Sequence, residues 1–203
     1  DRAASIRLAS PAENAQSPAP HMDPPRLIGN TGEYGEFVLT TGMSPDASGK
    51  ALAFDDFSHQ AVTWTLTAHE ARPGHELQFA RMIEAGVSIA RAVFAFNSVN
   101  VEGWGLYAES LGNDLGMYTD PYQYFGRLEG ELWRAIRLVV DTGLHSKGWT
   151  REQVLEYMDA NSSAAEARRV SETERYMAIP GQALAYKIGQ LKISELRARA
   201  EKE

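Results

Sequence analysis

The chain has 203 residues and a formal net charge of −7, with 43% hydrophobic and 23% charged residues. This composition is typical of a globular domain or of part of a larger one. The acidic balance disfavours nucleic acid and anionic membranes as partners, and no apolar run reaches the roughly 20 residues that a membrane-spanning helix needs. Because the chain has no cysteine, disulfides, iron–sulfur clusters and thiolate zinc sites are excluded, and a metal would need His, Asp or Glu ligands.

The N-terminal part of the sequence predicts little regular structure. Residues 1–30 are rich in Ala, Ser and Pro, which favours a linker or a loosely packed extension. One short strand is predicted at residues 36–41, followed by a loop at residues 43–50. The chain begins at Asp1 without a signal-like apolar stretch, and we expect it to be a fragment of a longer protein.

From about His59 onward the pattern is helical. A capping box formed by Thr150 and Gln153 predicts the start of one helix. Apolar residues at helical spacing, together with the positions of Pro and Gly, predict further helices at about 61–71, 76–84, 99–115, 122–145 and 180–199. The predicted fold class is therefore mainly α, with a short edge strand near residues 36–41, and residues 31–203 form one helical domain.

The most informative segment contains two histidines, His69 and His75. In H-E-x-x-H zinc hydrolases, two histidines one helical turn apart bind the metal and the intervening Glu is the general base. Here the second histidine comes two residues later, which places it about 120° around a regular helix. Pro73 opens the helix and Gly74 permits unusual backbone angles, so a two-residue bulge would return His75 to the face of His69.

Two other interpretations of this segment stay open. Pro73 and Gly74 could simply end one helix and leave both histidines on the surface. His69 and Glu76, which are seven residues apart, would share a face of an unbroken helix, although Pro73 disfavours such a helix. Convergence of the two imidazoles on one point is the structural test.

A second candidate group lies on the helix predicted at residues 99–115. Glu102 and Glu109 are two turns apart and share one face. Gly103 and Gly105 each cost about 1 kcal/mol relative to Ala inside a helix, which is explicable if another backbone or a substrate passes close. Glu102 is therefore a candidate third metal ligand, and Glu109 could orient a ligand histidine. Either could instead be a solvated helix acid.

Four motifs together resemble the bacterial family known as domain of unknown function 885. They are HEARPGHELQ (residues 69–78), EGWGLYAE (102–109), VVDTGLH (139–145) and PGQALAY (180–186). The resemblance spans roughly residues 30–190. Members are usually much longer, mostly helical proteins, so it implies that this chain is the C-terminal, metal-bearing part of one. The family is in turn similar to gluzincin peptidases such as the thimet oligopeptidase and carboxypeptidase Taq groups.

The resemblance implies a metallopeptidase site with one Zn²⁺ ion. Its metal ligands would be His69, His75 and Glu102, and Glu70 would be the general base. Many members have a second His where this chain has Glu76, so His75 is the only candidate for the second histidine ligand.

In the gluzincin relatives a Tyr or His donates a hydrogen bond to the oxyanion of the reaction. The candidates here are Tyr186 and His145, with Tyr176 as a competitor. His145 could instead lie at a helix C-terminus, where it is favourable to the dipole, and Tyr186 could be core packing. Arg134 and Arg137 could bind a substrate carboxylate or pair with nearby acids.

We therefore expect a zinc-dependent hydrolase that cleaves peptide bonds with a metal-activated water. The alternatives are a non-catalytic helical binding module that retains the motif, and a metal-dependent hydrolase of non-peptide amides or esters. The expected partners are a peptide substrate and either the missing N-terminal part of the parent chain or a second copy in a homo-oligomer. The compartment stays open between periplasmic or secreted and cytoplasmic.

Overall fold

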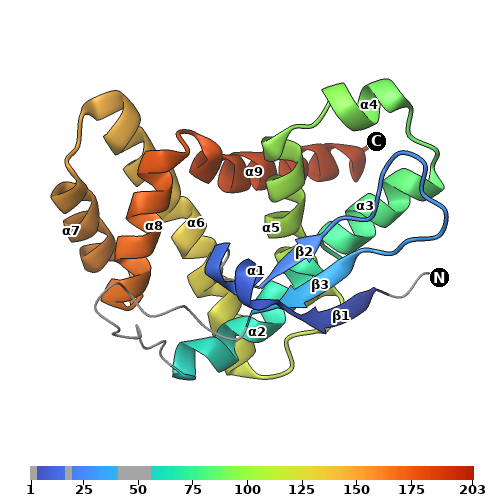
Figure 1. Cartoon of the computed structure of the whole chain (residues 1–203). Helices are drawn as coiled ribbons and strands as arrows, with labels where there is room; N and C mark the ends of the chain where they lie inside the picture. The colour runs from blue at the N-terminus through green and yellow to red at the C-terminus, as the bar shows by residue number, and fades with distance from the viewer. Residues whose placement is uncertain (1–3, 17–19, 41–55) are drawn as a thin grey trace.

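The computed structural model describes residues 4–16, 20–40 and 56–203, which are mainly helical, as predicted (Figure 1). The loop predicted at residues 43–50 lies outside these ranges. No helix within them is long and apolar enough to cross a membrane. The elements in chain order are β1 (Ser5–Leu8), α1 (Pro11–Gln16), β2 (His21–Asp23), β3 (Glu36–Leu39), α2 (Asp56–Glu70), α3 (His75–Glu84), α4 (Ile89–Phe94), α5 (Ser98–Asp114), α6 (Pro121–Lys147), α7 (Arg151–Asn161), α8 (Glu166–Ala178) and α9 (Gln182–Ala200).

The three strands form a small mixed sheet in the order β1-β3-β2. β3 runs parallel to β1 and antiparallel to β2. The strand predicted near residues 36–41 is therefore the central strand, and its prediction as an edge strand was wrong. Phe37 and Val38 are buried, as expected for a strand that is paired on both sides. The error arose because both partner strands are short and lie in the Pro-, Ala- and Ser-rich segment of residues 1–30.

That N-terminal segment contributes β1, α1 and β2, so it holds more regular structure than its composition suggests. Arg7 links these elements, because its guanidinium contacts Glu13 at 2.7 Å, Asp23 at 3.2 Å and Glu36 at 2.7 Å. All of these side chains are about a third exposed or more. Ion pairs this exposed add little stability, so their main effect is to fix how the strands align.

Local signals set the ends of the long helices. α6 begins at Pro121 after the N-cap Asp120 and is closed by Gly148, which has a left-handed conformation (φ 68°). This is the ordinary arrangement of Pro at a helix start and Gly just past its end. α7 begins at the capping box of Thr150 and Gln153, as predicted.

The helical core holds the functional elements in place. Eight buried side chains from α6 to α9 form one apolar cluster: Trp133, Ile136, Val140, Val154, Met158, Ala164, Tyr176 and Ala183. α9 also crosses α5 at very short range (Figure 1). A Cβ at Gly103 would lie 2.4 Å from the Cα of Gly189, and one at Gly189 would lie 2.0 Å from the carbonyl oxygen of Val99. The glycines therefore allow a helix contact that side chains would prevent.

Candidate metal centre

The two histidines of the H-E motif converge. α2 ends at Glu70 and α3 begins at His75, so the chain breaks at residues 71–74 rather than forming a two-residue bulge. Gly74 permits this break, because a Cβ there would lie 1.8 Å from the carbonyl oxygen of His69. The imidazole centroids are 4.7 Å apart, with the rings nearly perpendicular. Both rings are buried, so the surface interpretation is wrong.

Helix α5 fixes the break and makes room for both rings. The indole Nε1–H of Trp104 donates to the carbonyl oxygens of Pro73 (3.0 Å) and Gly74 (3.1 Å). One residue later, Gly105 faces the imidazoles. A Cβ on it would lie 2.6 Å from Nε2 of His69 and 2.9 Å from Cε1 of His75. The two imidazole rings therefore fit beside α5 only because Gly105 has no side chain.

Glu102, also on α5, completes the group. Its Oε2 lies 3.7 Å from Nε2 of His69 and 3.6 Å from Nε2 of His75. One potential ligand atom from each of these three residues lies within 4.8 Å of the others. Two ligands about 2.1 Å from a tetrahedral ion are about 3.4 Å apart, so the observed separations suit a divalent ion held by two nitrogens and one oxygen.

Glu109 orients His69 from behind. Its Oε1 lies 2.7 Å from Nδ1 of His69 and accepts a hydrogen bond from Arg134 at 3.1 Å, and its Oε2 accepts one from Thr65 at 2.8 Å. An ionised carboxylate can only accept, so Nδ1 carries the hydrogen and Nε2 faces Glu102. The orienting contact proposed for Glu109 is thus present, and it is completely buried.

The charges of the group favour a cation. Burial opposes a positive charge on His69, but hydrogen bonds with Glu102 and Glu109 outweigh it and raise its pKa to about 9. Burial raises the pKa of Glu102 and of Glu109, but the histidines beside Glu102, and Arg134 and His69 beside Glu109, hold both below the ordinary value. Without a metal, a proton on His69 therefore supplies the positive charge that the ionised carboxylates attract.

Comparison with known proteins identifies the family. The family model described as "Bacterial protein of unknown function (DUF885)" matches residues 1–203. The chain belongs to the DUF885 family. No curated protein matches its sequence.

Two solved structures share the fold of this DUF885 chain. A "putative lipoprotein" from Colwellia psychrerythraea is 39% identical, with a TM-score of 0.79 over 98% of this chain and 32% of its own. A "putative lipoprotein of unknown function" from Shewanella oneidensis is 20% identical, with a TM-score of 0.74 over 98% of this chain and 35% of its own. The DUF885 chain thus spans about a third of each, and the second likeness shows the fold alone.

Glu70, the candidate general base, ends α2 next to His69. Its Oε2 accepts a hydrogen bond from the backbone N–H of Met22 at 3.0 Å. This bond ties the end of α2 to strand β2 of the small sheet. It also leaves Oε1 as the carboxylate oxygen of Glu70 that has no hydrogen bond among the described residues.

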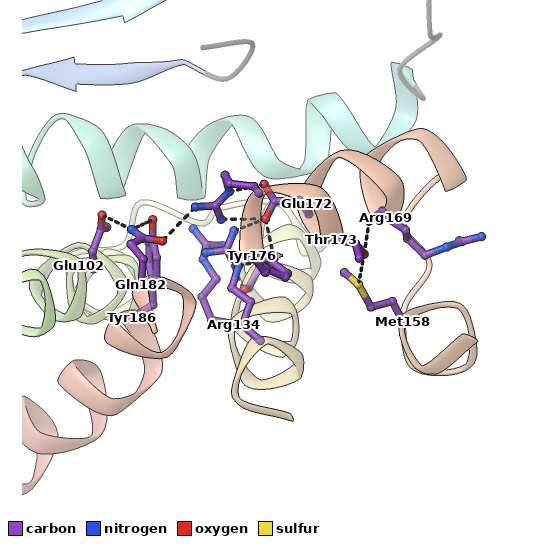
Figure 2. A network of polar contacts seen from close by, with 12 residues as sticks. Glu102, Arg134, Met158, Arg169, Glu172, Thr173, Tyr176, Gln182 and Tyr186 are labelled. Carbon is purple, nitrogen blue, oxygen red and sulfur yellow. Dashed lines mark hydrogen bonds and ion pairs between the residues drawn. The ribbon is translucent and has the colours of Figure 1, made fainter. Parts of the chain in front are cut away.

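Tyr186, the first candidate oxyanion donor, lies beside the histidine–glutamate group. Its ring stacks at 6.1 Å from the ring of His69. Its Oη accepts a hydrogen bond from Nε2 of Gln182 at 3.2 Å, and the same Nε2 donates to Oε1 of Glu102 at 3.2 Å (Figure 2). Burial and the charge of Glu102 raise the pKa of Tyr186, which keeps its hydroxyl protonated.

The second candidate donor, His145, is engaged elsewhere. It lies in the last turn of α6, where its Nε2 lies 2.9 Å from the carbonyl oxygen of Tyr176. The hydroxyl of Tyr176 accepts from Arg137 and donates to Glu172. Neither ring is among the contacts of the histidine–glutamate group, so we assign both to the packing of α6 against α8.

Three side chains that sequence reasoning did not assign to the site support it. Thr65 and Arg134 bind Glu109, and Gln182 binds Glu102. The sequence marked Arg134 only as a candidate for a substrate carboxylate. A residue of this kind is found in sequence only through its spacing to a candidate site residue, as with Gln182 four residues before Tyr186.

Proposed function

We propose that this DUF885 chain carries the catalytic centre of a zinc-dependent hydrolase that cleaves peptide bonds. The convergence of His69 Nε2, His75 Nε2 and Glu102 Oε2 carries the proposal. Two imidazoles and one carboxylate are a ligand set that zinc hydrolases use, with the fourth position left for water or substrate. The buried carboxylate of Glu109, which binds Nδ1 of His69, is the kind of support that metal-binding histidines usually have.

Glu70 and Tyr186 can supply the proton transfers and the oxyanion hydrogen bond that the reaction also needs. When bound, Zn²⁺ lowers the pKa of a coordinated water towards about 7 and polarises the scissile carbonyl. Oε1 of Glu70 takes the proton from the attacking water and later passes it to the leaving amine. The hydroxyl of Tyr186 donates to the developing oxyanion, an interaction worth about 3 kcal/mol in hydrolases.

Glu70→Gln tests this division of roles. The amide keeps an acceptor for the N–H of Met22 but cannot take a proton, so turnover should fall roughly 100- to 10,000-fold, the range expected for loss of general-base catalysis, while bound zinc stays at one per chain. Glu84→Gln, an exposed change at the end of α3, is the matched control. Unchanged turnover in Glu70→Gln would remove Glu70 from the mechanism.

The class of bond cleaved is a separate part of the proposal. It rests on the likeness of the family to gluzincin peptidases, because the same activated water also attacks esters and non-peptide amides. A panel of peptides, amides and esters compares them directly. A protein that contains zinc but turns over none of the panel would favour the binding-module alternative.

We also propose that this DUF885 protein acts in the cell envelope. The relative from Colwellia psychrerythraea, which is 39% identical to this chain, carries the description "putative lipoprotein". Fractionation of the source bacterium with an antibody against this chain tests the location. Recovery in the cytoplasmic fraction would contradict it.

A further inference from the structure

Gln182 stands in a fixed position at the start of α9. Gly181 precedes it in a left-handed conformation (φ 80°). The backbone N–H of Gly181 donates to the buried carboxylate of Asp141 at 3.1 and 3.2 Å. The first turn of α9 is thereby tied to α6, and the contact of Gly103 with Gly189 ties the same helix to α5.

The orientation of the Gln182 amide is determined by its neighbours. Its Oε1 accepts a hydrogen bond from Arg175 at 2.9 Å, and its Nε2 donates to Oε1 of Glu102 at 3.2 Å. A guanidinium can only donate and an ionised carboxylate can only accept, so the two ends of the amide cannot be exchanged. Arg175 itself donates to both carboxylate oxygens of Glu172, at 3.1 and 3.0 Å.

The orientation of the Gln182 amide determines which oxygen of Glu102 faces the histidines. Because Oε1 of Glu102 accepts from Gln182, the other oxygen, Oε2, faces the two histidines at 3.6 and 3.7 Å. A neutral amide holds the carboxylate without neutralising its charge, which a Lys or Arg in the same place would do. Glu102 is thereby set to offer one oxygen to an ion.

The amide of Gln182 also determines how the hydroxyl of Tyr186 can be used. Its Nε2–H donates to the phenol oxygen of Tyr186 at 3.2 Å. That oxygen then uses its own hydrogen for a different acceptor. With the ring stacked beside His69, the hydroxyl hydrogen is available to a group bound at the metal.

We propose that Gln182 is a positioning residue that selects Oε2 of Glu102 as the metal ligand and makes Tyr186 a donor toward the substrate. This inference rests on the proposed function, because it requires that His69, His75 and Glu102 hold Zn²⁺. It adds a residue whose effect is transmitted through Glu102 and Tyr186 rather than by contact with the ion.

Gln182→Met tests the metal arm, because Met has a similar shape but neither a strong donor nor a strong acceptor. The dissociation constant for Zn²⁺, measured by competition with a chelator, should rise roughly 10- to 100-fold, as is usual when a partner of a metal ligand is lost. Thermal melting of the metal-free protein reports any general loss of structure. If Gln182→Met does not fold, Gln182→Ala takes its place in the same comparison.

Gln190 provides a matched control on the same helix. It is buried, and its amide joins Lys187 (2.8 Å) to Glu131 (3.4 Å) as that of Gln182 joins Arg175 to Glu102. Gln190→Met should cost similar stability and change the zinc dissociation constant less than about threefold, since it contacts no metal ligand. An equal loss of zinc affinity in the two variants, or no loss in Gln182→Met, overturns the inference.

The effect of Gln182 on Tyr186 is tested by combining substitutions at saturating zinc. Tyr186→Phe and Gln182→Met should each lower kcat, and the double variant should lose no more than the worse single one, because both remove the same hydrogen bond to the oxyanion. Additive losses would contradict this arm.

The outcomes separate this inference from the proposed function. A wild-type chain that binds no zinc overturns both. Zinc binding and Glu70-dependent turnover, with an unchanged dissociation constant in Gln182→Met, overturn only the role of Gln182.

Discussion

Gly105→Ala should separate zinc binding from folding. Its added Cβ would lie 2.6 Å from Cε1 and Nε2 of His69 and 2.9 Å from Cε1 of His75. An ordinary contact needs about 3.5 Å, so the ring of His69 must retreat by about 0.9 Å. Metal–ligand distances tolerate only about 0.2 Å. The substitution therefore removes His69 Nε2 from its place in the ligand set.

The cost to stability should be small by comparison. Overpacking of this kind costs about 1–3 kcal/mol, while replacing Gly by Ala inside a helix gains about 1 kcal/mol. The metal-free protein should therefore lose about 0–2 kcal/mol in its free energy of unfolding. The zinc dissociation constant should rise more than about 100-fold, as expected when a ligand is displaced rather than only its supporting partner.

Gly143→Ala is the control for this prediction. It lies in α6, and its Cβ would lie 2.5–2.6 Å from the ring of Trp149, a clash similar in kind but away from the histidines and their supporting residues. Denaturant unfolding of the metal-free variants and isothermal titration with Zn²⁺ give the two quantities. Zinc affinity close to that of the wild type in Gly105→Ala would refute the proposed placement of the ion.

The remaining predictions concern ligands, their support and pH. His69→Ala and Glu102→Ala should lose bound zinc in elemental analysis, while His145→Ala should keep it; zinc loss in the last variant would return His145 to the site. Glu109→Gln should weaken zinc binding roughly 10- to 100-fold and destabilise the fold by about 3 kcal/mol, because Arg134 loses its buried partner; calorimetric melts matching the wild type would contradict this. In the metal-free chain, the pKa of His69 is raised from 6.5 to about 9. The proton on His69 therefore stabilises the fold by about 3 kcal/mol, an amount that is fully present below pH 6.5 and is lost as the pH rises through 9. Zinc affinity should change the opposite way, rising about tenfold per pH unit up to pH 9, because the ion displaces that proton; a flat pH dependence would exclude a protonated His69.

Elements with local signals could be predicted from the sequence, and elements without them could not. Pro121 and the capping box at Thr150 mark helix starts by themselves. α4 buries none of its residues, and α8 buries only Thr173 and Tyr176. α4 is only six residues long, and α8 is mostly polar and begins without a side-chain cap, so neither was predicted.

The candidate ligands and their supporting residues also differ in how far local sequence signals could predict them. His69, His75 and the Pro73-Gly74 pair are close in sequence, so their convergence could be proposed from local helix geometry, although the chain breaks there rather than forming the expected bulge. The contact between Gln182 and Glu102 joins residues 80 apart, and that between Thr65 and Glu109 joins residues 44 apart. Such pairs depend on how α2, α5 and α9 pack, which no local pattern encodes.

The broken motif also changes what holds the two histidines in register. In an H-E-x-x-H helix, the helical repeat alone sets the distance between the histidines. Here the chain turns at residues 71–74, and that turn is held by the indole of Trp104 and by the space at Gly105. Both belong to α5, which α9 fixes through the contact of Gly103 with Gly189. Zinc affinity should therefore be sensitive to a side chain added at Gly189, where α9 touches the backbone of α5, although Gly189 itself contacts no ligand.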